Sequence, residues 1–369
     1  MRLTTIILYT RDEAYAQYFT NFIRLEEKDK RYIFKVYTNK DQLIESTRNQ
    51  RFNIFLTDDK NTGIEESIFD EIIFLSEQEG LADEKTLYKY RPIKTLISQI
   101  LSLFYEVSGT PTSRLFETDQ DKVIAFYSGS GGEGKTITSL CLARHLSQIG
   151  KRVFYLNLEA FHTVDIFFKE NKQSSIEIFY YLKNNLDKLI AKIEGLKTID
   201  PNTNIEYFSY PIVPDEINQL TNREAEQLVQ ALRATNNYDY IIVDMDSVVD
   251  EKNEAILSIA DEIFWILDPV EKSMQRSSFY IENYYSQLMQ IKKSNIHFIL
   301  NKADDASQRV LNKYHFSIIE KIEWQPNWKQ LDESECVLAD TVVGLKLSEV
   351  INVNTEPLTE ANALYEDTI

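Results

Sequence analysis

The sequence predicts an α/β protein with two mostly parallel sheets, each covered by helices. Short β-branched or apolar runs alternate with stretches of helical spacing, first within 1–106 and again within 122–369. Several runs of the second series, such as YIIVD and IFWIL, are continuously apolar, as strands buried on both faces of a sheet are. The segment between the two series, 107–121, lacks apolar periodicity and is rich in hydroxyl residues, which is typical of a linker.

The first series is expected to form one domain over 1–106. Apolar residues at helical spacing, such as Ala14, Tyr18 and Phe22, indicate its first helix. We expect strands at 4–9, 32–37, 52–57, 72–76 and 86–88, and helices at 12–25, 41–47 and 93–105.

The second series is expected to form a larger domain over 122–369. Its strands are predicted at 123–127, 152–158, 204–208, 240–244, 262–267 and 296–300. Its helices are predicted at 135–149, 174–193, 222–235, 250–259, 271–293 and 304–313.

A glycine cluster marks a candidate nucleotide site. Four of the chain's ten glycines lie in GSGGEGKT, which fits the Walker A pattern G-x-x-x-x-G-K-[ST] between a predicted strand and a predicted helix. Such a loop turns backbone N–H groups inward, its lysine reaches the β- and γ-phosphates, and its hydroxyl serves Mg²⁺. We assign nucleotide binding to Gly129, Ser130, Gly131, Gly132, Glu133, Gly134, Lys135, Thr136 and Ile137.

Acidic residues at predicted strand ends complete a candidate catalytic set of Lys135, Glu159 and Asp244. Asp244 ends the strand YDYIIVD, where a Walker B carboxylate holds Mg²⁺ together with Thr136. Asp246 follows two residues later and is either a further metal ligand or a solvated loop acid. Glu159 either orients an attacking water or is a surface acid.

A candidate base site follows the strand IHFIL, in the sequence Asn301-Lys302-Ala303-Asp304. Read as N-K-x-D, this sequence predicts guanine recognition by Asp304. A strand-end asparagine alone serves adenine equally well, and Asp304 is also a plausible helix N-cap. ATP and GTP therefore stay open at this point, with Asn301 and Lys302 assigned to nucleotide binding.

Charge and cysteine content restrict the class of partner. The chain has 40 Lys and Arg against 58 Asp and Glu, a net charge of −18. Such a surface repels nucleic acid and anionic lipid, so we expect protein partners, no nucleic acid and no direct membrane insertion. Two cysteines form no disulfide framework, and we find neither a signal peptide nor an apolar span, which predicts a cytoplasmic location.

The order of motifs resembles the MinD/ParA group of P-loop ATPases. SGGEGKT, the strand ends NLE and VDMD, then LDPVEKSMQRS and LNKAD, follow one another as that group's motifs do. The resemblance covers about 123–325 and implies an ATP site with Mg²⁺ and a homodimer. Pro269 and Ser273 match the group's proline segment, and Asn301 matches its adenine-reading asparagine.

Three departures from that group bear on activity. The group's signature lysine is Ser130 here, its strand-end Asp-x-Asp is Asn157 and Glu159, and the chain ends in acidic rather than basic sequence. In the group that lysine reaches the phosphates of a partner subunit. The departures leave two alternatives, a slow ATPase and a nucleotide-bound scaffold without turnover.

The first domain resembles a response-regulator receiver, a flavodoxin-like fold. Asp58 follows the third strand, where the phospho-accepting aspartate lies, Ser76 ends the fourth, and Arg91-Pro92 resembles a Lys-Pro step. The acidic pair after the first strand is replaced by Tyr9 and Thr10, which indicates a pseudo-receiver used for docking.

A pseudo-receiver ahead of a MinD-like ATPase resembles the TadZ/CpaE family, which localises and assembles the tight-adherence (Flp) pilus machine, often at a cell pole. The resemblance implies nucleotide-dependent interactions with pilus or secretion proteins, and recruitment by partners to the pole or the inner face of the membrane. A partitioning ATPase of the ParA type is an alternative, although it requires basic surface for DNA.

Overall fold

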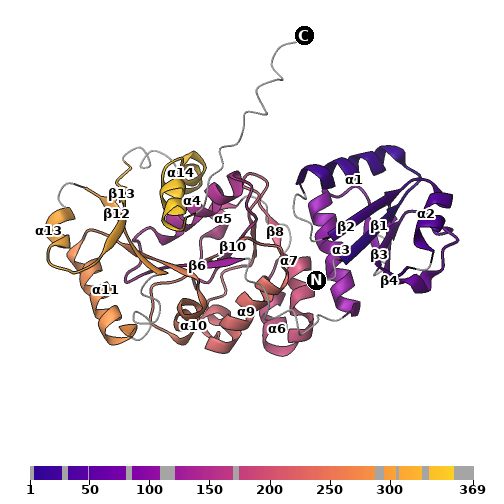
Figure 1. The fold of residues 1–369 in the computed structure, drawn as a ribbon. Coiled ribbons are helices and arrows are strands. Elements are labelled where there is room, and N and C mark those ends of the chain that lie inside the picture. The colour runs from indigo at the N-terminus through magenta and orange to yellow at the C-terminus, as the bar shows by residue number, and fades with distance from the viewer. Residues whose placement is uncertain are drawn as a thin grey trace, which may run out of the picture. The chain divides into compact units, whose positions relative to one another are not determined.

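The computed structural model describes residues 4–26, 32–48, 50–79, 85–108, 121–168, 174–286, 295–304, 307–325 and 332–352. The chain divides into two compact units (Figure 1). The first consists of 1–114 and 184–195, and the second of 115–183 and 196–369. Most of the predicted linker, residues 109–120, and the acidic tail at 353–369 lie outside the described residues.

The first unit contains a five-stranded parallel sheet in the order β2-β1-β3-β4-β5. Its alternating burial along β4 shows one face packed more closely than the other. The predicted strand at 72–76 begins three residues earlier, and the other four have the predicted bounds. The strands are β1 (Thr4–Tyr9), β2 (Tyr32–Tyr37), β3 (Phe52–Thr57), β4 (Phe69–Ser76) and β5 (Thr86–Tyr88).

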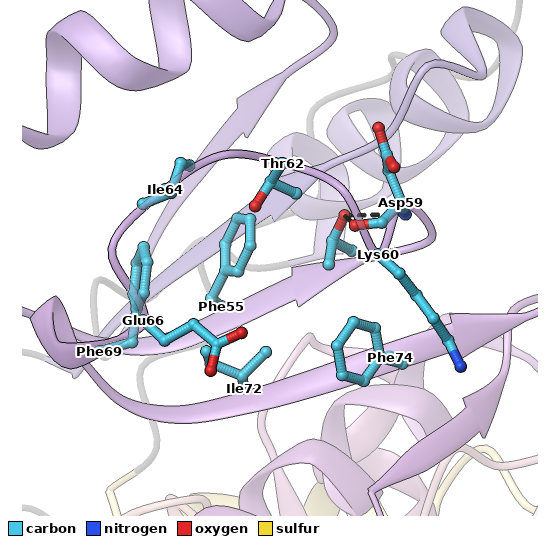
Figure 2. A pocket seen from close by; sticks show the side chains of 10 residues that line it. Phe55, Asp59, Lys60, Thr62, Ile64, Glu66, Phe69, Ile72 and Phe74 are labelled. Carbon is cyan, nitrogen blue, oxygen red and sulfur yellow. Dashed lines mark hydrogen bonds between the residues drawn. The ribbon is translucent and has the colours of Figure 1, made fainter.

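Three helices accompany this sheet, but the connection from β3 to β4 is a loop that ends in a short 3₁₀ helix (Glu66–Ile68). Figure 2 shows Ile64 on this loop above Phe55, with Phe74 on the strand below. The pocket between them has a volume of about 20 Å³, enough for one water. The helices are α1 (Glu13–Glu26), α2 (Lys40–Thr47) and α3 (Ile93–Ser108).

The predicted helix at 174–193 is two helices, α6 (Glu177–Asn184) and α7 (Leu189–Leu196). The break falls at Asn185, whose φ of −153° and ψ of 69° are not helical. Within the first unit, α7 lies close to α3, because Lys192 Nζ is 2.7 Å from a carboxylate oxygen of Glu106. The sequence pattern alone did not indicate that 184–195 groups with the first unit.

The second unit contains an eight-stranded sheet in the order β13-β12-β11-β6-β10-β7-β9-β8. Its described pairs are parallel except β8 with β9, so the predicted α/β fold with a mostly parallel sheet is confirmed. β8 and β13 were not predicted. The strands are β6 (Lys122–Ser128), β7 (Val153–Asn157), β8 (Thr198–Ile199), β9 (Glu206–Tyr207), β10 (Tyr240–Asp244), β11 (Glu262–Leu267), β12 (Ile296–Ala303) and β13 (Ile318–Glu323).

Helices cover both faces of this sheet, with α4 and α14 on one face and α9, α10 and α11 on the other (Figure 1). Side chains such as Ile124, Phe126 and Phe264 are fully buried beneath them. The parallel strands β6, β7, β10, β11 and β12 therefore bring their carboxyl ends to one edge of a rigid sheet. The helices are α4 (Lys135–Gln148), α5 (Val164–Phe167), α8 (Pro214–Asn218), α9 (Asn222–Ala234), α10 (Glu251–Ile259), α11 (Glu271–Asn283), α13 (Ser307–Leu311), α14 (Glu333–Ala339) and α15 (Val343–Val350).

Candidate functional site

The glycine-rich loop 129–134 joins β6 to α4 at the carboxyl edge of the sheet. Gly132 and Gly134 have φ of 78° and 93°, a left-handed conformation that side chains other than glycine rarely adopt. A Cβ at Gly134 would also collide with the side-chain amide of Asn301 on β12 and displace it. The glycines are therefore required by the turn and by its packing.

Neighbouring strands hold the loop through its carbonyl groups. Asn301 Nδ2 donates to Glu133 O at 2.8 Å, and Lys302 Nζ donates to Gly132 O at 2.8 Å. Ser128 Oγ donates to Ser130 O at 2.7 Å. These bonds fix the loop in place before any ligand binds.

Lys135 begins α4, and its side chain is 5% exposed. Its Nζ donates to Ser247 Oγ at 2.6 Å and lies 4.0 Å from Glu159 Oε1. Thr136 Oγ1 is 3.5 Å from Glu159 Oε2. The structure thus brings together the predicted residues Lys135, Thr136 and Glu159, and adds Ser247, which sequence reasoning missed.

Asp244 ends β10 and is fully buried. Its Oδ2 accepts from Tyr155 Oη at 2.8 Å and from Asn157 Nδ2 at 3.2 Å. Burial raises the pKa of Asp244, against the lowering effect of the Lys135 charge. Oδ1 is buried without a hydrogen-bond partner among the described residues, which is unusual for a carboxylate and leaves one oxygen for a ligand.

Asp246 is engaged by the protein on both carboxylate oxygens. Asn253 Nδ2 donates to Oδ1 at 2.7 Å, and Lys252 Nζ lies 3.2 Å from Oδ2. Lys252 is 1% exposed and also donates to Leu158 O at 3.0 Å, so it ties the loop after β7 to the loop after β10. These bonds favour a structural role for Asp246 over a metal ligand.

Two further carboxyl groups of the site have raised pKa values. Burial, with the nearby Asp244, raises the pKa of Glu159 to about 8. Burial raises the pKa of Glu133 to about 7, although the charge of Lys135 lowers it. Glu133 lies inside the loop and is 2% exposed. The site therefore holds more carboxyl groups than its own cations neutralise.

A cavity of about 890 Å³ opens beside the loop. Among the predicted residues, Gly131, Gly132, Gly134, Lys135, Thr136, Ile137, Glu159, Asn301 and Lys302 line it. Gly129, Ser130, Glu133 and Asp244 are not among its lining residues. The lining also contains aromatic residues that sequence reasoning missed: Phe161, Phe167 and Trp324. The volume is typical of a site for a nucleotide-sized ligand.

The two readings of the N-K-x-D sequence can be compared at this cavity. Asn301 lines it, whereas Asp304 is not among its lining residues. Asp304 Oδ1 accepts from Ser307 Oγ at 2.8 Å, at the start of α13. This local bond supports a helix-capping role for Asp304. Ser273 of the proline segment is 2% exposed, and its Oγ accepts from Asp268 N at 3.1 Å.

The candidate receiver residues of the first unit form a separate cluster. Asp58 Oδ2 accepts from Thr10 Oγ1 at 2.6 Å and from Lys89 Nζ at 2.8 Å, and Lys89 Nζ also donates to Asp12 Oδ2 at 3.0 Å. Burial lowers the pKa of Lys89, but its bonds to Asp58 and Asp12 outweigh this effect and leave the pKa raised. Sequence reasoning assigned the receiver's lysine position to Arg91. It missed Lys89, which directly follows β5, and it also missed Asp12.

Two features are absent from the described part of the chain: a group of metal-ligating side chains and a helix that could cross a membrane. Within it, no group of three or more His, Cys, Asp or Glu residues is arranged to hold a metal ion. No described helix is both long and apolar enough to cross a membrane.

Comparisons with known proteins find a family model, curated relatives and solved structures that resemble part of the chain. Residues 121–297 match the family model of an AAA domain (AAA_31). An uncharacterised ATP-binding protein of Methanocaldococcus jannaschii is 24% identical over 153 residues, which cover 40% of this chain and 53% of the relative. The septum site-determining protein MinD of Helicobacter pylori is 24% identical over 184 residues, covering 49% of this chain and 66% of the relative.

The chain spans between about half and two thirds of the length of these two relatives. Among solved structures, a candidate plasmid partition protein of Borrelia burgdorferi bound to AMPPNP has a TM-score of 0.50 at 16% identity. That alignment covers 63% of this chain and 96% of the other, and shows a shared fold. Together with the loop geometry, these comparisons show that the second unit is similar to an AAA domain over 121–297 and that part of the chain is similar to MinD.

Proposed function

We propose that the second unit binds Mg-ATP in the 890 Å³ cavity and changes its protein interactions with the nucleotide state. The observation that carries this proposal is the glycine loop, with Lys135 and Thr136 at its end, opening into that cavity. Lys135 would bind the β- and γ-phosphates, and Thr136 with Asp244 would hold Mg²⁺. A hydroxyl and a carboxylate suit this hard cation, and Asp244 Oδ1 is an unpartnered buried oxygen.

The base is proposed to be adenine. Asn301 lines the cavity, and although one of its Nδ2 hydrogens is given to Glu133 O, its second hydrogen and its Oδ1 can serve the acceptor and donor edge of adenine. Asp304, which guanine recognition requires, is bonded to Ser307 instead. This arrangement favours ATP over GTP.

Hydrolysis is proposed to be slow, with Glu159 as the water-orienting group. Its carboxyl lies 4.0 Å from Lys135 Nζ, and its pKa of about 8 leaves it mostly protonated near pH 7, which fits slow proton acceptance. A nucleotide-bound scaffold without turnover is a second candidate. It is favoured by Asn157, whose amide is bonded to Asp244 where the superfamily motif has an acid.

The first unit is proposed to be a pseudo-receiver that docks partners. Its strand order, 2-1-3-4-5, is the flavodoxin-like order. Asp58, at the acceptor position, is already paired with the covered Lys89 and with Thr10. Together with the motifs of TadZ/CpaE proteins, these features support a role in localising or assembling a tight-adherence pilus or a related secretion machine, often at a cell pole.

The partners are proposed to be a second copy of the chain and proteins of that machine. The net charge of −18 fits protein partners better than DNA, which weighs against the partitioning alternative. Recruitment to the pole or to the inner face of the membrane would then depend on those proteins.

The decisive experiment is the solution mass of the full chain by light scattering, without nucleotide, with Mg-ADP and with Mg-ATP. We expect a monomer that becomes a dimer with Mg-ATP, and a Lys135→Ala variant that stays monomeric. Phosphate release, measured in the same samples, separates the two candidates: turnover supports the slow ATPase, and dimerisation without turnover supports the scaffold.

Two results would contradict the proposal. If isothermal titration shows no binding of Mg-ATP, the nucleotide role is wrong. If Mg-ATP binds and neither the mass nor the capture of pilus-assembly proteins changes, the nucleotide does not act as a switch.

A further inference from the structure

Helix α11 is packed directly against the start of the phosphate loop. A Cβ at Gly129 would lie 2.6 Å from Ser277 Oγ and 2.9 Å from Ser277 N, so the two backbones are as close as glycine allows. Ser277 is itself fixed, because Trp265 Nε1 donates to its Oγ at 3.1 Å. Residues of α11 next to Ser277 therefore have a defined position at the loop.

One of these residues is a cation. Arg276 precedes Ser277, and its Nη1 donates to Ser130 Oγ at 3.3 Å. This bond reaches the second residue of the loop, from an exposed side chain. A guanidinium is thereby held at the rim of a loop that is shaped for phosphate.

Arg276 differs from the other cations at the loop in having no carboxylate partner among the described residues. Lys135 lies 4.0 Å from Glu159, and Lys302 lies 2.8 Å from Asp268. Among the described residues, Arg276 forms no ion pair, although the chain carries 58 acidic residues. Its one described bond is to a neutral hydroxyl, which is a weak partner for a guanidinium.

We propose that Arg276 is a phosphate-binding residue that contacts the terminal phosphate of a nucleotide held by its own chain's loop. The proposal rests on the proposed ATP site and adds a residue to it. A guanidinium presents several donors in a planar fork that matches phosphate oxygens, and these charge-assisted bonds are stronger than a bond to serine. Arg276 would exchange its bond to Ser130 for that contact.

The test compares affinities for Mg-ATP and Mg-ADP by isothermal titration of the full chain. The variants are Arg276→Ala, Arg276→Lys and a matched control, Lys272→Ala, which removes an exposed cation one turn away on α11 with no described bond to the loop. We expect Arg276→Ala to weaken Mg-ATP about tenfold and Mg-ADP by less than about threefold, since only ATP carries the terminal phosphate. Lys272→Ala should bind as the unchanged chain does, and Arg276→Lys should fall between.

Each other outcome overturns the inference in a recognisable way. If the unchanged chain binds Mg-ATP and Arg276→Ala binds it equally well, Arg276 is only a surface residue and the ATP site stands. If ATP and ADP weaken equally, the residue does not contact the terminal phosphate. If the loss appears only at concentrations where the mass doubles, Arg276 acts on a second copy's nucleotide. If the unchanged chain binds no nucleotide, the proposed function itself fails first.

Discussion

The carboxyl edges of the two sheets each bring a covered lysine close to carboxyl groups, but the pKa values of those carboxyl groups are shifted differently. In the first unit, Lys89 has a fully covered side chain and is bonded to both Asp58 and Asp12. In the second, Lys135 faces Glu159 and Asp244, whose pKa values are both raised. Each edge sets one lysine against two carboxyl groups, but hydrogen bonds lower the pKa of Asp12 at the first edge, whereas burial raises the pKa values of Glu159 and Asp244 at the second.

The pockets described in the two units also differ in volume, although Lys89, Asp58 and Asp12 do not line the pocket of the first unit. The pocket in the first unit, between β3, β4 and the loop that joins them, measures about 20 Å³, against about 890 Å³ beside the phosphate loop. A parallel sheet edge collects polar side chains in either case, but a ligand site also needs unsatisfied groups and room. At the second edge, the raised carboxyl pKa values and the 890 Å³ cavity occur together, which is why we place the proposed ligand there rather than at the first edge.

We call the edge with Lys89, Asp58 and Asp12 the closed edge, and the edge beside the phosphate loop the open edge. The strongest test of this comparison is to remove the cation of the closed edge. Lys89→Met removes a covered ammonium that bonds to both Asp58 and Asp12, and because these carboxylates remain partly solvated we expect the first unit to lose about 2 kcal/mol of unfolding free energy. Urea unfolding of the full chain, with hydrogen exchange to resolve peptides of each unit, measures this loss.

A matched control is Arg11→Met, which removes a largely exposed cation that pairs with Asp59. That variant should change stability little, because exposed ion pairs contribute little. If Lys89→Met is equally harmless, the closed-edge interpretation is wrong.

The matching change at the open edge is Lys135→Met. We expect Mg-ATP binding to weaken about a hundredfold, because a charge-assisted phosphate contact is lost. Stability without nucleotide should fall by only about 1 kcal/mol or less, because Glu159 and Asp244 can protonate instead of remaining as unpaired charges. Titration calorimetry and urea unfolding give the two values. A stability loss as large as that of Lys89→Met would remove the contrast between the edges.

The open edge was predictable where its signal is local. The loop 129–134 carries its pattern within a few residues, and Asp244 ends a run of apolar residues that reads as a buried strand. The same holds for most strands of both sheets, whose apolar runs are continuous. The α/β class follows from the alternation of these strands with helices, whereas the order of the strands in each sheet was not predicted.

The closed edge was not predictable in the same way, because its contacts are long-range. Lys89 lies 77 residues from Asp12 and 31 from Asp58, and no local pattern links them. Trp324 follows β13, whose alternating exposed and buried residues give a weaker signal than a buried strand does. The grouping of α7 with the first unit depends on tertiary packing, which overrides helical periodicity at Asn185.

A third test uses the buried carboxyl of the phosphate loop, Glu133. Its pKa is about 7 in the folded chain against an ordinary value of 4.5. The folded state therefore binds more protons than the unfolded state between these pH values, and stability falls as pH rises through that window. We expect Glu133→Gln to remove this fall, so that the variant is more stable than the unchanged chain by about 3 kcal/mol at pH 8. Urea unfolding at pH 5.5 and pH 8 without nucleotide checks it, and equal pH slopes for both proteins would contradict it.

The smallest expected effect concerns the far end of the open edge, where Trp324 lines the cavity beside β12. Trp324 is 43% exposed and can therefore meet a base that enters the cavity, whereas Trp265 is fully buried. We expect Trp324→Ala to weaken Mg-ATP about fivefold, since an aromatic pair adds a modest contribution. Because a triphosphate alone carries no base, its affinity should not change in this variant, and Mg-tripolyphosphate titrated in parallel is the control. An equal loss for both ligands would mean that Trp324 shapes the loop rather than the base site, and the open edge would then end at the phosphates.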